Sequence, residues 1–407
     1  MSLLFATPAA LGAAEKRLLL LLATAFFVGQ YDMTILTLAL PNVQDSFSIS
    51  EESLGQLLGT ARLGALPAIL LALLADRVGR RRLLVVTLLG LSLSAVATGF
   101  AQTVTQFIAF QFCARLFTTT EEILAVIYAL EMLPSRHRGW GVGFLAAMGA
   151  LGSGLAALLY AGVDFLPGGW RALYVIGALP ILYVAWLRRK LPESRMYEQQ
   201  IRNNQQAPFW QPFAEIFLNH RRAILAVALI STTFWFQISA SLNFISKYLQ
   251  ETHSYSPGQV SSLFIIAGLA AIFGNIVAGR VSDAIGRRPT LAAGIAVNCT
   301  AFLLFYNSSG FLLPLAWIAA LFSFFVVDVV ANATTGELFP TRCRSTASTL
   351  RTIFSVTAGV AGLTLEGSLY TQLGSHAAAI SLLTLSSLLA LPAVALLLRE
   401  TANTDLS

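Results

Sequence analysis

Twelve stretches of mainly apolar residues run through this chain of 407 residues, separated by short polar segments. An α-helix needs about 20 apolar residues to cross the hydrocarbon core of a bilayer, so each stretch is a predicted membrane span. The spans are 18–40, 54–75, 83–101, 107–130, 141–163, 171–189, 222–250, 258–280, 290–307, 312–334, 346–370 and 376–399. The predicted fold class is therefore all-α, a polytopic membrane protein with 12 transmembrane helices.

The composition agrees with this assignment. Hydrophobic residues make up 56% of the chain and charged residues only 11%, whereas soluble proteins carry about 25% charged residues. So little charge cannot solvate so large an apolar surface in water, which excludes soluble, disordered and nucleic-acid-binding classes of protein. A lipid bilayer is the predicted environment.

The sequence contains no pattern of metal ligands, cofactor-binding residues or catalytic groups. The three cysteines, Cys113, Cys299 and Cys343, have neither metal-ligand nor disulfide spacing, and the four histidines form no cluster in the sequence. No phosphate-binding G-x-x-x-x-G-K-[ST] motif occurs. We therefore expect no metal, no cofactor and no enzymatic activity.

Basic residues are concentrated in alternate connections between the spans. Lys and Arg accumulate on the cytoplasmic side of membrane proteins, and most of the 26 Lys and Arg residues share one side when both termini are cytoplasmic. This pattern predicts a multi-pass protein of the plasma membrane, the inner membrane in a bacterium. The one long connection, 190–221, is a predicted cytoplasmic linker between an N-terminal six-helix bundle (1–189) and a C-terminal six-helix bundle (222–407).

Two loop motifs occur once in each half of the chain. The motif D-x-x-G-R-R begins at Asp76 and again at Asp283, 207 residues later. The motif E-x-x-P-x-R-x-R begins at Glu131 and again at Glu337, 206 residues later. Because two unrelated motifs repeat in nearly the same register, the two halves are predicted to be repeats of one unit.

With these motifs and the central basic loop, the whole chain resembles the major facilitator superfamily, and within it the sugar porters and the metabolite and organic-acid proton symporters. Gly29–Asp32 reads G-Q-Y-D, similar to the G-Y-D of sugar porters, and Pro192–Ser194 follows span six. The resemblance implies two six-helix bundles that rock about a site near the membrane midplane. The glutamine- and asparagine-rich start of span seven in sugar porters is reduced here to Gln237 and Asn243, which disfavours a sugar as the substrate.

The repeated loops are predicted to form a cytoplasmic gate. A carboxylate and a guanidinium at the ends of adjacent helices can pair, with support from the helix dipoles. Such pairs can form in one state of a transport cycle and break in the other. If these loops served only to fix the orientation of the protein in the membrane, basic residues would be enough. An acidic residue nevertheless begins the motif in all four loops. The candidate gate residues are Asp76, Gly79, Arg80, Glu131, Arg138, Asp283, Gly286, Arg287, Glu337 and Arg344.

Ionisable residues inside the spans are costly in hydrocarbon and therefore indicate function. At about 1.5 Å per residue, Asp32 and Arg62 lie roughly 12 Å from the outer face and Arg115 roughly 15 Å, so the three can share a layer. A guanidinium beside Asp32 would allow its carboxyl both to gain and to lose a proton. In the sugar porters that this chain resembles, an aspartate in span one and an arginine in span four have this coupling role. The alternative is a permanent ion pair between spans one and four.

Glu122 is the second candidate proton carrier. It follows Arg115 by seven residues and lies on the same helical face, whereas Glu121 is rotated away by about 100°. Several organic-anion symporters carry an arginine and a glutamate at this spacing. For Glu121, a neutral acid hydrogen-bonded to a neighbouring helix is an equal alternative. The repeat places Asp328 in the second half at the position of Glu122 in the first.

Polar groups within the spans supply the candidate substrate-binding residues. Asp328 either contributes to the substrate site or helps to close the inner gate. Lys247 and Arg351 lie near span ends, where long basic side chains reach the membrane interface. The candidate substrate-binding residues are Tyr31, Arg62, Gln237, Asn243 and Asp328.

Together these features predict a secondary active transporter that carries a small polar metabolite, an organic acid or a sugar-like molecule, with protons by alternating access. One alternative is a drug/proton antiporter of the same fold, although span five (141–163) lacks the glycine-proline motif typical of that class. The other is a membrane sensor that does not transport. The expected partners are a small-molecule substrate, protons and lipid, without nucleic acid, and the chain is expected to be a monomer.

Overall fold

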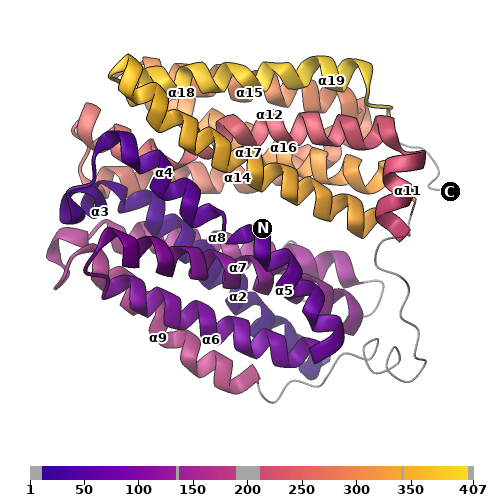
Figure 1. The fold of residues 1–407 in the computed structure, drawn as a ribbon, viewed down its shortest axis with the longest axis horizontal. Helices are drawn as coiled ribbons and strands as arrows, with labels where there is room; N and C mark the ends of the chain where they lie inside the picture. Colours follow the sequence, from indigo (N-terminus) through magenta and orange to yellow (C-terminus); the bar gives the residue numbers. More distant parts are fainter. Residues whose placement is uncertain (1–11, 134–136, 189–210, 341–342, 402–407) are drawn as a thin grey trace. The chain divides into compact units, whose positions relative to one another are not determined.

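The computed structural model describes residues 12–133, 137–188, 211–340 and 343–401, and every regular element in these ranges is a helix (Figure 1). The all-α prediction is therefore confirmed. The chain forms two compact units. Unit 1 consists of residues 1–47 and 63–206, and unit 2 of residues 48–62 and 207–407.

Unit 1 is built on long helices whose apolar faces pack together. In this unit α2 lies against α8, α7 and α9, and α6 lies against α7 and α9. Leucine and alanine side chains from α2, α6 and α7 form the largest part of its core. The elements are α2 (Ala13–Leu38), α3 (Leu40–Phe47), α5 (Ala65–Val78), α6 (Arg80–Gly99), α7 (Val104–Met132), α8 (Arg138–Tyr160), η2 (Val163–Phe165) and α9 (Trp170–Arg188).

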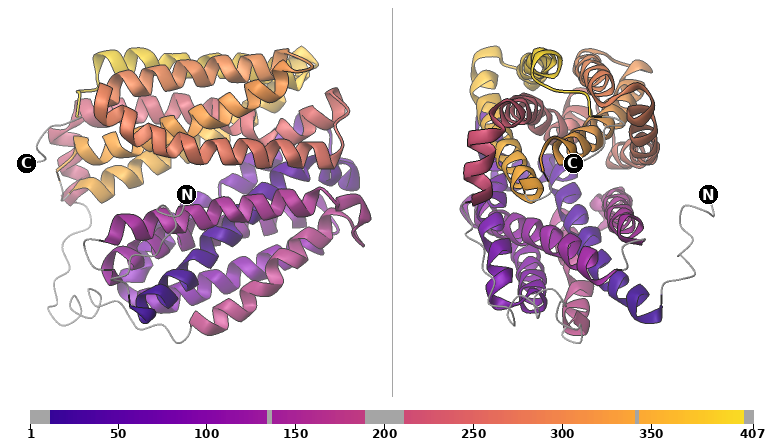
Figure 2. Two further views of the ribbon diagram at one scale, coloured as in Figure 1. Left: turned by 180° about the vertical axis from the view of Figure 1, so that it is seen from behind. Right: turned by 90° about the vertical axis from the view of Figure 1, so that its right-hand side faces the viewer.

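Unit 2 has the same construction, and its helices run alongside one another in the views of Figure 2. Helix α17 packs against α12 and α4, and α16 packs against α14 and α15. The elements are α4 (Glu51–Arg62), α11 (Gln211–Asn219), α12 (Arg221–Asn243), α13 (Ile245–Lys247), the π-helix η3 (Tyr248–Thr252), α14 (Pro257–Ile285), α15 (Arg287–Asn307), α16 (Leu312–Leu338), α17 (Arg344–Leu373), α18 (His376–Leu385), η5 (Ser386–Leu389) and α19 (Ala390–Leu396).

The glycines of the two D-x-x-G-R-R motifs have the same conformation. Gly79 alone separates α5 from α6 with φ = 101°, and Gly286 alone separates α14 from α15 with φ = 106°. A side chain is strained at such positive φ angles, so glycine permits the sharp turn between two long helices. The predicted sequence repeat is thus a repeat of backbone structure.

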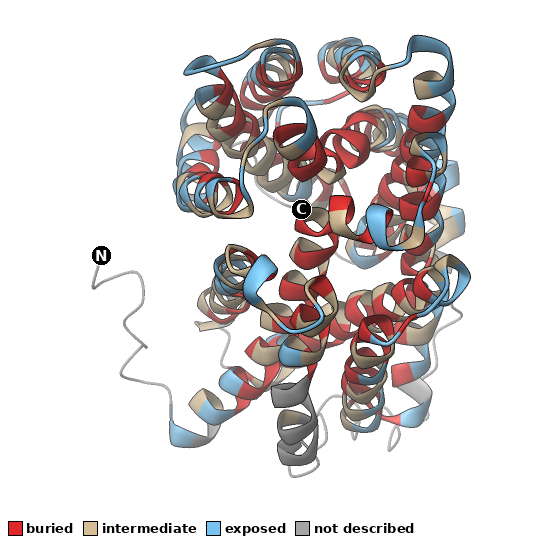
Figure 3. Cartoon of the chain, turned by 90° about the vertical axis from the view of Figure 1, so that its left-hand side faces the viewer, coloured by how far each residue is buried: buried red, intermediate tan, exposed pale blue. Residues whose placement is uncertain are grey.

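Ten helical segments of the described residues are long and apolar enough to cross a membrane. Three of them are composite: Glu51–Ala72 runs through α4 into α5, Arg221–Thr252 through α12, α13 and η3, and His376–Leu396 through α18, η5 and α19. The other two predicted spans, 107–130 and 171–189, coincide with α7 and α9. Helix α7 has a more polar middle than the ten because it carries Arg115, Glu121 and Glu122. Large apolar side chains are exposed on the outer faces of many helices, including Leu70 at 69% and Phe273 at 62%, whereas buried residues line the inner faces (Figure 3). Such a surface is suited to lipid tails.

Two details of the predicted organisation differ in the structure. The end of the predicted linker is helix α11, whose Phe213 and Ile216 pack with Phe339 and Leu350 in the core of unit 2. Its apolar residues are spaced three apart, a helical pattern inside an otherwise polar segment. Span two is divided at Leu63 into α4 and α5, and α4 packs in unit 2 although it precedes the predicted linker.

Candidate functional site

Three ionisable residues of unit 1 lie on the facing helices α2 and α7. The Arg115 guanidinium interacts electrostatically with the carboxyl groups of Asp32 and Glu122, as the spacing on α7 predicts. Gln30 Nε2 donates a hydrogen bond to Glu122 Oε1 at 3.2 Å. The helices approach closely at Gly29, where a Cβ atom would lie 2.6 Å from Thr118 Cγ2. The absence of a side chain at this glycine lets Glu122 reach α2.

Asp32 is buried, with an exposed fraction of 6%, and does not face lipid. Its Oδ1 atom has no hydrogen-bond partner among the described residues, and Arg115 does not form a direct ion pair with it there. Arg115 Nη1 instead donates to Met33 Sδ at 2.7 Å. The permanent ion pair considered as the alternative role of Asp32 is thus absent from the described part of α2 and α7, and the guanidinium acts on this acid through space.

Glu121 occupies a different environment from its neighbour Glu122. Its side chain is fully buried, and Thr87 on α6 donates a hydrogen bond to its Oε2 atom. This arrangement matches the hydrogen-bonded acid that was one of the two expectations for Glu121. The 100° rotation between successive residues of a helix turns the two side chains toward different neighbouring helices, although the carboxyl groups still interact electrostatically.

Two of the predicted substrate-binding residues join helices instead of facing open space. The Tyr31 hydroxyl donates to the Leu173 carbonyl oxygen at 2.7 Å, and its exposed fraction is 3%. Gln237 is fully buried; its Nε2 donates to Asn298 Oδ1 at 2.9 Å, and its Oε1 accepts from Ser241 at 3.0 Å. Both ends of the Gln237 amide are thus engaged within unit 2, and the roles of Gln237 and Tyr31 in binding substrate stay predictions.

Two other predicted substrate-binding residues are partly exposed in unit 2. The Arg62 guanidinium lies 5.1 Å from the centre of the Trp235 ring, a cation–π contact between α4 and α12. Asn243 Nδ2 donates to the Ser239 carbonyl oxygen at 2.7 Å, one turn earlier in α12. Arg62 thus packs with unit 2, and both residues retain some accessible surface.

The fifth predicted residue, Asp328, forms an ion pair that the sequence analysis missed. Its Oδ1 atom lies 2.6 Å from Arg351 Nη2, so α16 and α17 are joined by charge. Arg351 was expected to extend toward the interface, but its exposed fraction is only 9%. The sequence did carry a signal for this pair. Both residues lie two to three helical turns from the α16–α17 connection, and a charged residue at that depth in a membrane needs a partner.

The repeated loops form equivalent ion pairs, each within its own unit. Arg80 pairs with Glu131 in unit 1, and Arg287 pairs with Glu337 at 2.9 Å in unit 2. Asp283 adds a second carboxylate to Arg287 at 2.7 Å. These pairs join the turn between two helices to the end of a third.

Of the other charged gate candidates, the structure describes the side chain of Arg344. Arg344 Nε donates to the Phe339 carbonyl oxygen at 3.2 Å. The side chains of Asp76 and Arg138 lie outside the described part of the structure. Glu400 belongs to neither repeated motif and was not predicted; its carboxylate accepts a hydrogen bond from the Arg287 backbone N–H at 2.7 Å and caps the start of α15.

A second ionic cluster in unit 2 was also missed. Both ring nitrogens of His376 contact carboxylates, Nδ1 that of Glu366 at 2.5 Å and Nε2 that of Glu51 at 2.8 Å. Lys247 Nζ lies 3.0 Å from Glu51 and 2.6 Å from Glu251, so this lysine is paired. An imidazole between two carboxyl groups needs a proton on each nitrogen or on one of the acids. The proton on the imidazole or its acids thus joins α4, α17 and α18, and Lys247 links α13 and η3 to the same cluster.

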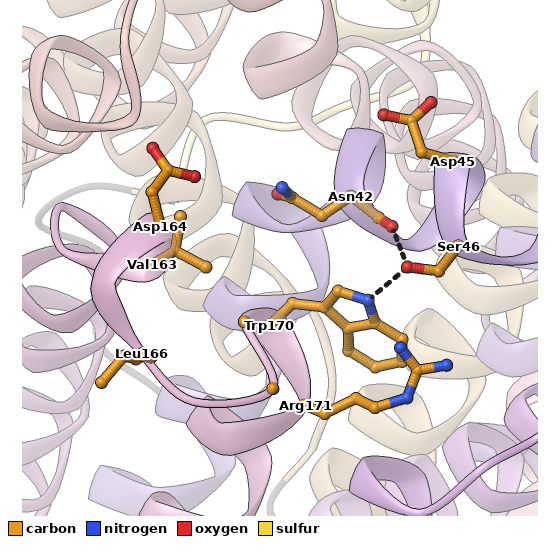
Figure 4. Close-up of a pocket in the computed structure, with 10 residues that line it drawn as sticks. Asn42, Asp45, Ser46, Val163, Asp164, Leu166, Trp170 and Arg171 are labelled. Carbon is orange, nitrogen blue, oxygen red and sulfur yellow. Dashed lines mark hydrogen bonds between the residues drawn. The ribbon is translucent and has the colours of Figure 1, made fainter.

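A polar pocket in unit 1 lies between α3 and the connection from α8 to α9 (Figure 4). Trp170 Nε1 donates to Ser46 Oγ at 2.9 Å, and the Arg171 guanidinium lies 4.4 Å from the Trp170 ring centre. Asn42 and Asp45 complete the α3 side. Because Asn42 follows Asp32 by ten residues, roughly 15 Å of helix, the pocket is separate from the buried ionisable residues of α2 and α7.

Comparisons with known proteins agree with this architecture. The family model described as Major Facilitator Superfamily matches residues 22–256 and 227–406. The cis,cis-muconate transport protein of Acinetobacter baylyi is 28% identical over 338 residues, covering 79% of this chain and 80% of that protein. The niacin transporter NiaP of the same organism is 26% identical over 344 residues, covering 77% of this chain and 78% of that protein.

Solved structures show the same fold. The inward-open xylose transporter XylE from E. coli matches with a TM-score of 0.78 and 17% sequence identity, covering 96% of this chain and 98% of that chain. The human organic anion transporter MFSD10 matches with a TM-score of 0.70 and 18% identity, covering 95% of this chain and all of that chain. Since the family model extends over nearly the whole sequence, this multi-pass membrane protein belongs to the Major Facilitator Superfamily.

Proposed function

We propose that the protein is a secondary active transporter that carries a small organic acid together with protons by alternating access. The observation that carries this proposal is the buried Asp32 carboxyl, which has an oxygen without a hydrogen bond to any described residue and lies within electrostatic reach of Arg115. Relatives named as transporters of muconate and niacin support the organic-acid part of the proposal.

Charge balance in the α2–α7 cluster supports proton binding. One guanidinium, that of Arg115, faces two carboxyl groups, those of Asp32 and Glu122. The group is electrically neutral only when it holds one proton, and net charge is expensive away from water. A change in water access would therefore load or unload a proton here. Asp32 is the better carrier because, in the part of the chain that the structure describes, its Oδ1 makes no hydrogen bond that a proton would disrupt.

We further propose that the repeated loops open and close the cytoplasmic side, with both termini in the cytoplasm. The ion pairs of Arg80 with Glu131 and of Arg287 with Glu337 hold each loop in a fixed conformation. The halves 1–189 and 222–407, joined by the linker 190–221, would then move as bodies in the transport cycle. The segment α4 would have to change its packing as they move.

A ligand screen on the purified protein tests the substrate class. We expect nicotinate, cis,cis-muconate or related acids to raise the melting temperature, because a ligand at 100 times its Kd stabilises the folded state by about 2.7 kcal/mol. Xylose serves as the uncharged comparison. Stabilisation by xylose and by none of the acids would contradict the proposal.

Flux in proteoliposomes then separates transport modes. An outside-acid gradient should drive the acid inward, and an inside-acid gradient should drive it outward, whereas an antiporter gives the opposite directions. A sensor would bind the ligand without moving it across the membrane.

Glu122→Gln should change the pH dependence of transport. The amide retains an oxygen that can accept the hydrogen bond from Gln30, but it cannot take up a proton. The initial rate of uptake, measured from pH 5 to pH 9, should therefore lose one titration step. Glu121→Gln is the comparison: Glu121 accepts a hydrogen bond from Thr87 and acts on Glu122 only through space, so this variant should move the titration step without removing it. An unchanged profile for Glu122→Gln would exclude Glu122 from the proton path.

A further inference from the structure

Asp328, Asn332 and Arg351 form a hydrogen-bonded ionic group between α16 and α17. Arg351 Nη2 lies 2.6 Å from Asp328 Oδ1, and Arg351 Nη1 donates to Asn332 Oδ1 at 2.7 Å. Asn332 Nδ2 donates to Asp328 Oδ2 at 3.1 Å, which closes the ring of contacts. Asp328 and Asn332 are one turn apart and therefore share a face of α16.

This group lies well inside the predicted membrane. Arg351 is seven residues from the start of α17 and Asp328 ten from the end of α16, or roughly 10 and 15 Å at 1.5 Å per residue. The Arg351 side chain is 11% exposed, whereas that of Asp328 is 29% exposed and Asn332 is exposed. An exposed carboxylate against lipid tails would be very costly. We therefore take this face of α16 to be in contact with water, with the guanidinium behind the acid.

Arg351 has donor capacity that its two partners do not use. A guanidinium presents its N–H groups in a planar fork that matches both oxygens of one carboxylate. Here Asp328 meets only one terminal nitrogen through one oxygen, and the buried Nε has no hydrogen-bond partner among the described residues. A buried N–H without a partner is unusual and needs an explanation. An incoming carboxylate could occupy this fork more completely than Asp328 does.

The internal repeat indicates that this arginine is not required by the architecture. Asp328 is the repeat equivalent of Glu122, but the position equivalent to Arg351, 206 residues earlier, is Leu145. In the first half the corresponding acid, Glu122, accepts a hydrogen bond from Gln30 and is near Arg115 on its own helix, so its charge is met without an arginine at this repeat position. The second half therefore carries a guanidinium that its repeat partner folds without.

We propose that Arg351 binds the carboxylate of the transported organic acid and that Asp328 holds the guanidinium when the site is empty. This inference rests on the proposed function. One guanidinium neutralises one carboxylate, so the substrate and Asp328 compete for Arg351. Asn332 keeps the guanidinium in place while its ionic partner changes.

Competition predicts opposite effects at the two charged residues. Arg351→Gln should weaken binding of nicotinate or cis,cis-muconate by about 10-fold or more, the usual effect of removing a charged hydrogen-bond partner. Asp328→Asn should tighten binding of the same acid, because the guanidinium no longer has an internal carboxylate. Nicotinamide and the dimethyl ester of muconate, which lack the charge, should bind both variants as they bind the parent protein.

Two further variants separate binding from folding. The double variant Asp328→Asn/Arg351→Gln removes both charges and leaves no unpaired ion, so it should fold and bind the acid as weakly as Arg351→Gln. Arg351→Lys keeps the charge without the fork and should give intermediate affinity. Binding is measured by isothermal titration of the purified protein in detergent.

The outcomes distinguish this inference from the proposed function. If the parent protein binds no carboxylic acid, the proposed function is wrong and the site is wrong with it. If the parent binds an acid and Arg351→Gln binds it equally well, only the site is wrong. If both single variants weaken acids and uncharged probes alike, the pair is structural and the inference is overturned.

Discussion

Asp32→Asn should abolish accumulation of substrate against its gradient while leaving exchange of substrate across the membrane intact. Asparagine has nearly the size of aspartate but cannot carry a proton, so the buried position on α2 would be filled and unable to couple. A gradient of one pH unit supplies about 1.4 kcal/mol, enough for 10-fold accumulation in one-to-one symport. In proteoliposomes we expect this ratio for the parent protein and a ratio near one for the variant.

Tyr31→Phe is the control for this experiment. It is the neighbouring residue, is equally buried, and loses only the hydrogen bond to the Leu173 carbonyl oxygen. It should still accumulate substrate to the parent ratio, although its stability is lowered. An Asp32→Asn protein that concentrates substrate as the parent does would show that another group couples the proton.

Gly152→Val should strongly destabilise unit 1. A Cβ atom at Gly152 would lie 1.9 Å from the Phe27 carbonyl oxygen on α2, a distance at which backbone atoms must move. Overpacking in a close-packed interior typically costs about 1–3 kcal/mol and sometimes more, and here the contact is backbone against backbone between α2 and α8. We expect a lower melting temperature and a smaller yield of monodisperse protein in detergent.

Gly154 provides a matched comparison two residues further along α8. A Cβ atom there has no neighbour within 4 Å, so Gly154→Val changes the same helix by the same side chain without the clash. Gly154→Val should melt close to the parent protein. Equal melting temperatures for the two valine variants would mean that α2 and α8 are not packed at Gly152 as described.

The fold could be predicted from the sequence because its signals are local or repeated. Apolar stretches of the right length gave the membrane helices, and the register of two motifs identified the repeat that Gly79 and Gly286 display in their backbone angles. Helix α11 at the end of the linker was not predicted, because two apolar residues, Phe213 and Ile216, are too few to raise the hydropathy of a short polar segment. The division of span two near Leu63 has no strong local signal, since glycines are common in these spans.

The candidate site was harder to predict because partners lie far apart in the sequence. Gln237 and Asn298 are 61 residues apart, and Tyr31 contacts the backbone 142 residues away. A polar residue in a span gives no information on which neighbour it meets, so residues that join helices resemble residues that face a ligand. The pair of Arg115 and Glu122 was more tractable because a seven-residue spacing fixes a common helical face.

The contact between α4 and α17 has glycine on both sides. Cβ atoms at Gly55 and Gly367 would lie 2.1 Å from the Leu363 carbonyl oxygen and 2.2 Å from the Glu52 carbonyl oxygen, respectively. Because glycine has no side chain, α4 and α17 can separate and pack together again at these two positions without a change of rotamer. The energy barrier to their separation should therefore be low. The ionic contacts of His376 with Glu51 and Glu366 would then determine how long α4 stays packed against α17. The glycines would determine how fast the two helices separate once those contacts break.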